Sequence, residues 1–289
     1  MVHLIDGHVW IFRAYHALPW MAGPDGTPTF AAYGFAQTLL KYLRDERPSH
    51  VAVCFDHALT SFRNELEPGY KADRSEAPAD LEPQFDLCAE AARALGVRTF
   101  EAEGFEADDL IATLCRQLVA RRARVVVVSA DKDLAQLVRE DGRVVLRDDA
   151  RGTTLDADGV RGKFGVDPRR IPDWLGLVGD AVDSLPGVPG VGPRSAAALL
   201  LAFGSLEAIP ADPAGWSGVA VRGAARLAAR VEEHRGRALR TRELATLVDR
   251  VPGLDASLRQ LRVRAPDPKR VAELCERLGW TGLRRRILG

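Results

Sequence analysis

The sequence predicts an α/β fold, with a parallel sheet in the first part of the chain and an all-helical region after it. Short apolar runs alternate with helical patterns up to about residue 165. This alternation is typical of a parallel sheet that carries helices on both faces. Beyond that point only helical periodicity remains, interrupted by turns that contain Gly and Pro.

The expected elements follow in order along the chain. Apolar runs predict strands over residues 2–5, 50–55, 97–100, 124–129 and 144–146. Helical periodicity predicts helices over residues 33–43, 84–95, 106–120 and 134–138, and, in the second region, over 171–178, 221–234, 240–247 and 268–278, with a further helix that follows the stretch 185–196 and ends at about 202. The stretches 204–218 and 251–254 are expected to be connecting turns.

The composition is that of a soluble globular chain. Of the 289 residues, 46% are hydrophobic and 28% are charged, which disfavours disorder. No apolar run approaches the roughly 18 residues of a membrane span. The first residues lack the basic start of a signal peptide. We therefore expect a cytoplasmic protein with no membrane partner.

The cysteines and the charge distribution add two expectations. Cys54, Cys88, Cys115 and Cys275 are too far apart for a zinc motif, so we expect buried, reduced thiols. Net charge is zero, yet residues 217–289 hold 17 Lys and Arg against 8 Asp and Glu. A basic part joined to an acidic part fits a metal site beside a phosphate-binding surface, although basic helices are often simply solvated.

Acidic residues gather where the predicted strands end. Asp6, Asp56 and Asp131 each follow an apolar run closely, and the carboxyl ends of parallel strands share one edge of a sheet. Glu106, Asp108 and Asp109 begin the helix 106–120, and Asp133 follows Asp131. Acids in a first helical turn are common as caps. The clusters at 106–109 and 131–133 together hold five carboxylates, which would repel each other on one rim, so the pairing of these two clusters favours a metal site.

The segment from residue 61 to 83 is polar and basic, with aromatic residues interleaved. It is too long for an ordinary connection. Its basic residues, Tyr70 and Phe62 suit a nucleic-acid strand, through charge and base stacking. Taken alone, the segment is equally compatible with a surface loop.

A second phosphate-binding feature is predicted in the helical region. Asp180 and Asp183 lie three residues apart, on one helical face or turn, and a Gly- and Pro-rich stretch from 185 to 196 follows. Its three glycines let the backbone approach a ligand closely, two valines can fix the turn to a core, and the next helix begins with free N–H groups. This pattern is a fairly specific signature of a helical hairpin.

These residues together resemble the 5′-nuclease family: the 5′→3′ exonuclease domain of bacterial DNA polymerase I, flap endonucleases and stand-alone bacterial relatives. The matching stretches occur in the family's order and cover nearly the whole chain. They are Leu4-Ile5-Asp6-Gly7, Phe55-Asp56, Ser61-Phe62-Arg63, Gly69-Tyr70-Lys71-Ala72, Glu106-Ala107-Asp108-Asp109, Ala130-Asp131-Lys132-Asp133-Leu134, Gly179-Asp180 with Asp183, and residues 185–196.

The resemblance implies a fold, a domain division and a form of the protein. Residues 1–165 are expected to form a PIN-like nuclease domain, with an arch or gateway at about 61–83. Residues 166–289 are expected to form a helix-three-turn-helix DNA-binding domain. Because no polymerase sequence follows, the stand-alone bacterial form is expected.

The resemblance also implies roles for single residues. Asp6, Asp56, Glu106 and Asp108 match ligands of a first metal ion, and Asp131, Asp133 and Asp183 match ligands of a second, with Asp108 or Asp131 shared between them. Asp109 and Asp180 match acids that support the site. The expected catalytic set is Lys71, Asp108 and Asp131. The expected DNA-binding residues are Arg63, Tyr70, Lys71, Arg74, Gly187, Val188, Gly190, Val191, Gly192, Arg194 and Ser195.

Two positions depart from the family pattern. The family usually has Asn after the last acid, where this chain has Ser184, and Lys in the hairpin helix, where it has Arg194. The first change is expected to weaken the positioning of Asp183, and the second keeps the charge.

The expected activity is phosphodiester hydrolysis with two Mg²⁺ or Mn²⁺ ions about 4 Å apart. The substrates would be DNA 5′ ends, flaps and junctions, with RNA–DNA hybrids as a further substrate. A K⁺ ion is expected at the hairpin, a DNA polymerase as a partner, and a monomeric state. The alternatives are a PIN-like ribonuclease and a non-catalytic protein that binds DNA structures.

Overall fold

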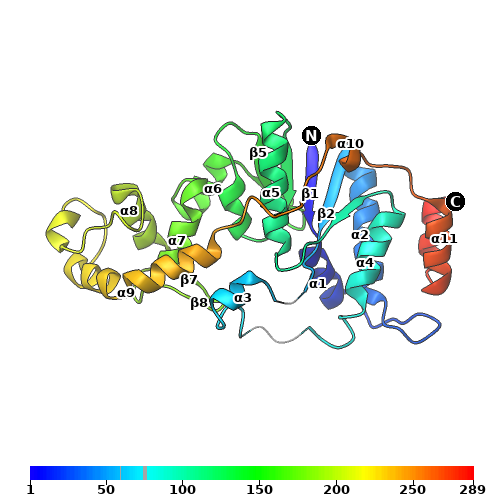
Figure 1. The fold of residues 1–289 in the computed structure, drawn as a ribbon, viewed down its shortest axis with the longest axis horizontal. Coiled ribbons are helices and arrows are strands. Elements are labelled where there is room, and N and C mark those ends of the chain that lie inside the picture. Colours follow the sequence, from blue (N-terminus) through cyan, green and yellow to red (C-terminus); the bar gives the residue numbers. More distant parts are fainter. Residues whose placement is uncertain (59, 74–76) are drawn as a thin grey trace. The chain divides into compact units, whose positions relative to one another are not determined.

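The computed structural model describes residues 1–289 except 59 and 74–76 (Figure 1). The chain forms two compact units that are not continuous in sequence. Unit 1 comprises Met1–Leu59, Glu76–Ala130 and Asp249–Gly289, and unit 2 comprises Thr60–Ser75 and Asp131–Val248. The chain therefore leaves unit 1 twice and returns to it for its last segment.

Unit 1 is built on a parallel sheet, as the alternating pattern predicts. Its strands are β1 (Val2–Asp6), β2 (His50–Cys54), β3 (Arg98–Phe100) and β4 (Val125–Val128), and they pair in the order β3-β2-β1-β4. All residues of β1 and β4 are buried, because helices cover both faces of such a sheet. Asp6 pairs with Cys54 in register, so the ends of β1 and β2 lie together at one edge.

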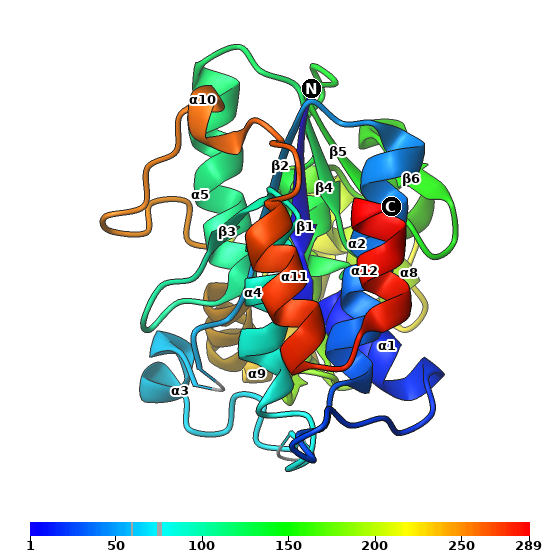
Figure 2. The same cartoon turned by 90° about the vertical axis from the view of Figure 1, so that its right-hand side faces the viewer.

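The helices of unit 1 include three that the periodicity did not predict, at residues 7–17, 258–261 and 281–288. They are α1 (Gly7–Ala17), α2 (Phe30–Glu46), α4 (Gln84–Ala94), α5 (Ala107–Ala120), α10 (Leu258–Leu261), α11 (Pro268–Arg277) and α12 (Thr281–Leu288). Figure 2 shows α11 beside α4 and α12 beside α2, so the last helices complete the unit that begins with β1.

Unit 2 is mainly helical. Its elements are α3 (Phe62–Leu66), η1 (Asp133–Leu137), β5 (Val144–Asp148), β6 (Thr153–Leu155), α6 (Ala157–Phe164), η2 (Pro168–Arg170), α7 (Ile171–Val178), β7 (Gly179–Asp180), β8 (Leu185–Pro186), α8 (Pro193–Phe203), η3 (Pro213–Trp216) and α9 (Ala224–Ala245).

Unit 2 differs from the sequence prediction in several elements, and its helices α3 and α6 were not predicted. The strand at 144–146 is longer and pairs antiparallel with β6. Asp180 lies on β7, in a short hairpin with β8, and Asp183 lies in the turn between these strands, so of the two alternatives the turn is found and not the helical face. The two helices predicted at 221–234 and 240–247 are one, α9, which continues through Gly236. A glycine inside a helix costs only about 1 kcal/mol, and packing of α9 against α7 outweighs it.

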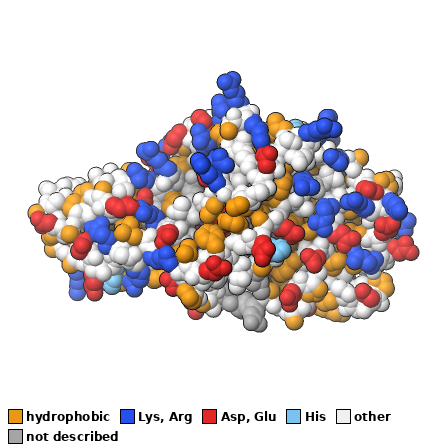
Figure 3. Space-filling view, viewed as in Figure 1, with side chains coloured by type: hydrophobic (Ala, Val, Ile, Leu, Met, Phe, Trp, Pro, Cys, Tyr) orange, Lys and Arg blue, Asp and Glu red, His pale blue; other side chains and the backbone are white. Residues whose placement is uncertain are grey.

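The cysteine prediction is confirmed: all four thiols are buried and free. Among the described residues, no helix has both the length and the apolar character needed to cross a membrane. Lys and Arg side chains are interspersed with Asp and Glu on the face drawn in Figure 3.

Candidate metal centre

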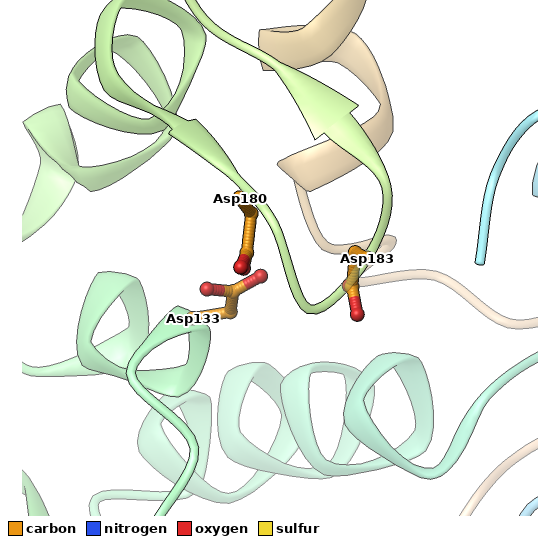
Figure 4. A group of neighbouring side chains, drawn as sticks. All are labelled: Asp133, Asp180 and Asp183. Carbon is orange, nitrogen blue, oxygen red and sulfur yellow. The ribbon is translucent and has the colours of Figure 1, made fainter. Parts of the chain in front are cut away.

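Unit 2 holds a tight group of three carboxylates, Asp133, Asp180 and Asp183. One carboxylate oxygen from each lies within 4.8 Å of the others, and all three residues are buried. Asp133 begins η1, Asp180 ends β7, and Asp183 lies on the loop that leads to β8 (Figure 4). Oδ1 of Asp133 is buried and has no hydrogen-bond partner among the residues that the structure describes. Three buried acids with such an oxygen fit a divalent cation, which prefers oxygen ligands.

The electrostatics of this group also favour a bound cation. Burial first, and then the charge of Asp131, raise the pKa of Asp133 well above its ordinary value. The ammonium nitrogen of Lys132 lies 2.5 Å from Oδ2 of Asp180. Burial, the largest single effect, lowers the pKa of Lys132, but the hydrogen bond to Asp180 and the charges of Asp133, Asp180 and Asp131 together outweigh it, so the pKa is raised. Lys132 is thus a cation held inside the acidic group, where the sequence analysis assigned it no role.

The segment that carries Tyr70 and Lys71 is fastened to the loop that carries Asp183. The hydroxyl of Tyr70 donates to Oδ2 of Asp183 at 3.3 Å. The N–H of Lys71 donates to the carbonyl of Asp183 at 2.9 Å. The N–H of Asp73 donates to Oγ of Ser184 at 3.1 Å. These three bonds fix the position of Lys71 relative to the acidic group.

Ser184 has a left-handed backbone conformation, with φ of 56°. This region costs energy for most residues, and Asn adopts it more readily than Ser. This preference explains physically why the family usually has Asn at this position of the loop. Ser184 occupies the position at the cost of some backbone strain, while its hydroxyl still accepts the bond from Asp73.

Unit 1 holds the other predicted acids except Asp131. Asp6 is the N-cap of α1 and also accepts from the Ser129 hydroxyl at 2.9 Å. Oδ1 of Asp56 accepts from the N–H of Ala107, the first residue of α5, at 2.6 Å. Glu106 and Asp109 form a reciprocal capping box at the start of α5.

The charges of Asp6, Asp56 and Asp108 act on one buried thiol, that of Cys54. Burial and the nearby charges of Asp6, Asp108 and Asp56 raise the pKa of Cys54. Unit 1 therefore gathers these acids at the edge where its strands end, as predicted, but among the described residues only the group in unit 2 brings three ligand atoms within 4.8 Å. Asp131 is not in that group, and its Oδ1 accepts from the N–H of Asp133 at 2.9 Å.

The predicted DNA-binding residues of the 61–83 segment have unequal access to solvent. Arg63 is only 1% exposed and donates to the carbonyls of Leu244 and Thr246 at the end of α9. Its guanidinium is therefore used inside unit 2, and this burial counts against a contact with DNA. Tyr70 is 3% exposed. Lys71 is half-buried, with its ammonium over the Tyr70 ring, and Arg74 lies outside the described residues.

The turn at 187–192 has the predicted construction. Val188 and Val191 are buried, whereas Gly190 and Arg194 are exposed. Gly187 is required because an added Cβ would lie 2.3 Å from the carbonyl carbon of Val178. Gly192 is the N-cap of α8, and an added Cβ there would meet nothing within 4 Å. The turn thus presents backbone at the start of a helix, a suitable surface for a phosphate.

Three side chains of α9 support this turn, and sequence reasoning missed them. Arg230 donates to the carbonyl of Pro189, Arg237 to that of Gly187, and Thr241 to that of Pro186. The residues lie about 40 to 55 positions from their partners, so no local pattern could have indicated the contacts.

Comparison with known proteins gives the chain a family. The model of the 5′-3′ exonuclease N-terminal resolvase-like domain matches residues 1–165, and that of the 5′-3′ exonuclease C-terminal SAM fold matches residues 166–269. Since these matches cover most of its length, the chain belongs to the 5′-3′ exonuclease family. The family predicted from the motifs is confirmed.

Similar curated proteins are much longer than this chain. DNA polymerase I of Rhizobium leguminosarum is 45% identical over 214 residues, 71% of this chain and 21% of that protein. DNA polymerase I of Mycobacterium leprae (strain TN) is 39% identical over 291 residues, 99% of this chain and 31% of that protein. The chain thus spans less than a third of the length of these two relatives.

Solved structures confirm the predicted fold class. A T5 5′-exonuclease with bound zinc has a TM-score of 0.67 at 20% identity, over 86% of this chain and 89% of that chain. The catalytic core of Rad2 in complex with a DNA substrate has a TM-score of 0.64 at 16% identity, over 99% of this chain and 90% of that chain. At these identities the likeness shows a shared fold.

Proposed function

We propose that the chain is a divalent-metal-dependent 5′→3′ exonuclease and flap endonuclease, which hydrolyses phosphodiester bonds of DNA at 5′ ends or branched junctions. The observation that carries this proposal is the buried group of Asp133, Asp180 and Asp183 in a chain of the 5′-3′ exonuclease family. The metal and the DNA named for similar structures support it.

Each acidic group is proposed to hold one ion, Mg²⁺ or Mn²⁺. Asp133, Asp180 and Asp183, with Asp131 beside them, would hold one. The unit 1 acids would hold the other. They are Asp6, Asp56, Glu106 and Asp108, with Asp109 in support through the capping box. A divalent ion held in this way supplies stabilisation for the negative charge that builds up on the phosphate oxygens.

The chain's own residues have separable roles in this proposal. Lys132 offsets part of the negative charge of the group in unit 2. Lys71, whose segment is bonded to Asp183, would neutralise charge on the scissile phosphate as it reacts. Arg74 would guide the 5′ end. The turn at 187–192, with Arg194 and Ser195, would hold the duplex backbone without reading bases, together with a K⁺ ion.

The biological setting is part of the proposal too. The named relatives are DNA polymerases I, of which this chain matches less than a third. A DNA polymerase is therefore proposed as the functional partner, in the removal of primers or flaps. RNA–DNA hybrids are proposed as a further substrate, and the active form as a monomer.

The test uses matched DNA substrates with the label at either the 5′ or the 3′ end: single-stranded, blunt, nicked and 5′-flap, plus an all-RNA strand. Each is incubated with Mg²⁺ or Mn²⁺, or with excess chelator. We expect cleavage near the 5′ end of nicked and flap DNA, only with metal. Cleavage of single-stranded RNA in preference to DNA would instead indicate a ribonuclease. Binding without cleavage under every condition would indicate a non-catalytic protein.

A further inference from the structure

Unit 1 contains a basic groove in which the proposed chemistry has no part. It has a volume of about 680 Å³ and lies between α1, α2 and α12, which are side by side in Figure 2. Four of its lining residues are cationic: Arg13, Lys41, Arg44 and Arg286. No Asp or Glu is among the lining residues that the structure describes.

Arg13 is the most informative of these cations. Its side chain is half-buried, yet it makes no hydrogen bond or ion pair with any residue in the described part of the chain. A partly desolvated guanidinium usually has a carboxylate or carbonyl partner. The other three cations have partners but are exposed: Lys41 and Arg44 pair with Asp45, and Arg286 donates to the Tyr33 hydroxyl.

The floor of the groove is apolar and close to the backbone. An added Cβ at Gly34 would lie 2.7 Å from Cβ of Ala14 and from Cδ1 of Leu18. The glycine thus allows α1 and α2 to pack tightly beneath the groove. Cations above an apolar floor suit a ligand that has phosphates on one side and sugars or bases on the other.

The arrangement favours a strand over a single ion. Arg286 bonds to Tyr33 near the start of α2, and Arg44 lies eleven residues further along this helix, a span of about 16 Å. One small anion cannot reach cations spread over that length and on α12. A strand carries a phosphate on every nucleotide and can reach them in succession. A volume hollowed between helices also admits one strand more readily than a duplex.

The groove leads away from the carboxylates of unit 1. Helix α1 begins directly after Asp6, at the edge where the strands end. Helix α2 ends at Glu46, four residues before β2 begins at His50. Lys41 and Arg44 are therefore close to the opposite edge of the sheet, where the strands begin.

We propose that this groove binds a single-stranded nucleic-acid segment of the substrate, at a site separate from the carboxylates. The inference rests on the proposed function, because it assumes a nucleic-acid substrate. It adds a second contact, which would favour substrates that carry a single-stranded extension over blunt duplexes. An acidic protein segment is the competing occupant of the groove.

The test measures anisotropy of labelled DNA in chelator, where no cleavage is expected. The probes are a blunt duplex, the same duplex with a 5′ single-stranded extension, and the same duplex with a 3′ extension. The groove variant is Arg13→Glu with Arg286→Glu. The matched control is Arg259→Glu with Arg264→Glu, two exposed arginines of unit 1 outside the groove. If the melting temperature of the groove variant is below that of the wild type, the double variant Arg13→Gln with Arg286→Gln replaces it.

We expect the wild type to bind at least one extended duplex roughly tenfold more tightly than the blunt one, and the groove variant to lose this difference. The slope of log affinity against log salt concentration should become shallower in the groove variant, by the amount expected for the loss of about two phosphate contacts. The control should keep the difference, and cleavage of a nicked duplex should be unchanged in both. The inference is overturned if the groove variant keeps the difference, if it loses blunt-duplex affinity equally, or if the wild type has no difference. Absence of metal-dependent cleavage by the wild type would count separately, against the proposed function.

Discussion

The ammonium nitrogen of Lys132 lies 2.5 Å from Oδ2 of Asp180 and 3.9 Å from Oδ1 of Asp133. A positive charge is thus already present in the group of acids that is proposed to hold a metal ion. It reduces the repulsion between these buried carboxylates. It also competes with any divalent ion for Asp180, since both are attracted by the same oxygens.

Lys132→Met tests this competition. The substitution keeps an unbranched side chain and removes the charge. We expect Mn²⁺ to bind roughly threefold or more tightly, because it no longer competes with an ammonium group, and the metal-free protein to melt a few degrees lower. Calorimetric titration and thermal melts measure the two effects. Lys163→Met, on the exposed surface of α6, is the control. Weaker Mn²⁺ binding would mean that Lys132 mainly holds Asp180 in position.

The raised pKa of Asp133 predicts a pH dependence of the metal-free protein. Burial, followed by the charge of Asp131, raises this pKa in the folded state above the roughly 3.9 of an unfolded Asp. The stability that neutral Asp133 contributes is therefore complete below about pH 4 and is lost as pH rises through the folded pKa. The side chain of the Asp133→Asn variant stays neutral at every pH. We therefore expect the free energy of unfolding of this variant to exceed that of the wild type by an amount that grows with pH in chelator and vanishes with Mg²⁺. Denaturant unfolding from pH 4 to 8 measures it.

The control for this pH series is Asp158→Asn, at an exposed position of α6. Its stability relative to the wild type should show no comparable growth with pH. A constant difference between wild type and Asp133→Asn over the whole series would show that Asp133 is not held in its neutral form.

Gly192→Asp tests the turn at 187–192. Gly192 has φ of −94° and open space around it, so a side chain fits without strain, and Asp is a good N-cap. We expect unchanged or slightly higher thermal stability, but duplex binding weaker by roughly tenfold on unrelated sequences, because the new charge repels phosphate. Anisotropy titration measures the affinity. Gly192→Asn supplies a neutral cap as control. The prediction fails if the Asp variant binds duplex as tightly as the Asn variant.

Lys71→Ala separates a role in chemistry from a role in steering. If Lys71 stabilises charge on the reacting phosphate, the single-turnover rate at saturating enzyme should fall by roughly 10²-fold. Lys71→Arg keeps the charge and should retain most of the rate. Both share the left-handed backbone of Lys71, with φ of 56°, so backbone cost does not differ between them. Recovery of the wild-type rate with more enzyme would make Lys71 a steering residue.

Much of the fold could be predicted because the signals were local. The run Val125–Val128 indicates a buried strand, and of two strands that the structure pairs in parallel, one ends at Asp6 and the other ends two residues before Asp56. The convergence of acids at that edge followed from the topology alone. The antiparallel strand β6 was missed because three residues carry too little periodicity to be recognised.

The rest depended on contacts between residues far apart in the chain. Arg63 is a basic residue of the kind that contacts DNA, but it donates to two backbone carbonyls that lie 181 and 183 residues further along the sequence. The hydrogen bond that joins Asp183 to Tyr70 spans 113 residues of sequence. The pairing of Lys132 with Asp180 crosses 48. No spacing in the sequence reports such contacts, so the burial of Arg63 and the position of Lys132 required coordinates.

The most direct test of the account measures single-turnover cleavage of a 5′-labelled flap against Mg²⁺ concentration, alongside equilibrium Mn²⁺ binding and duplex binding. The variants are Asp183→Asn, Asp131→Asn and Asp108→Asn, with Asp86→Asn on the exposed surface of α4 as control. We predict loss of cleavage in the first three, with weakened Mn²⁺ binding but intact folding and duplex affinity, and wild-type behaviour in the control. Undiminished hydrolysis in excess chelator, or by all three variants, would contradict the central claim that these carboxylates hold the metal that cleavage requires.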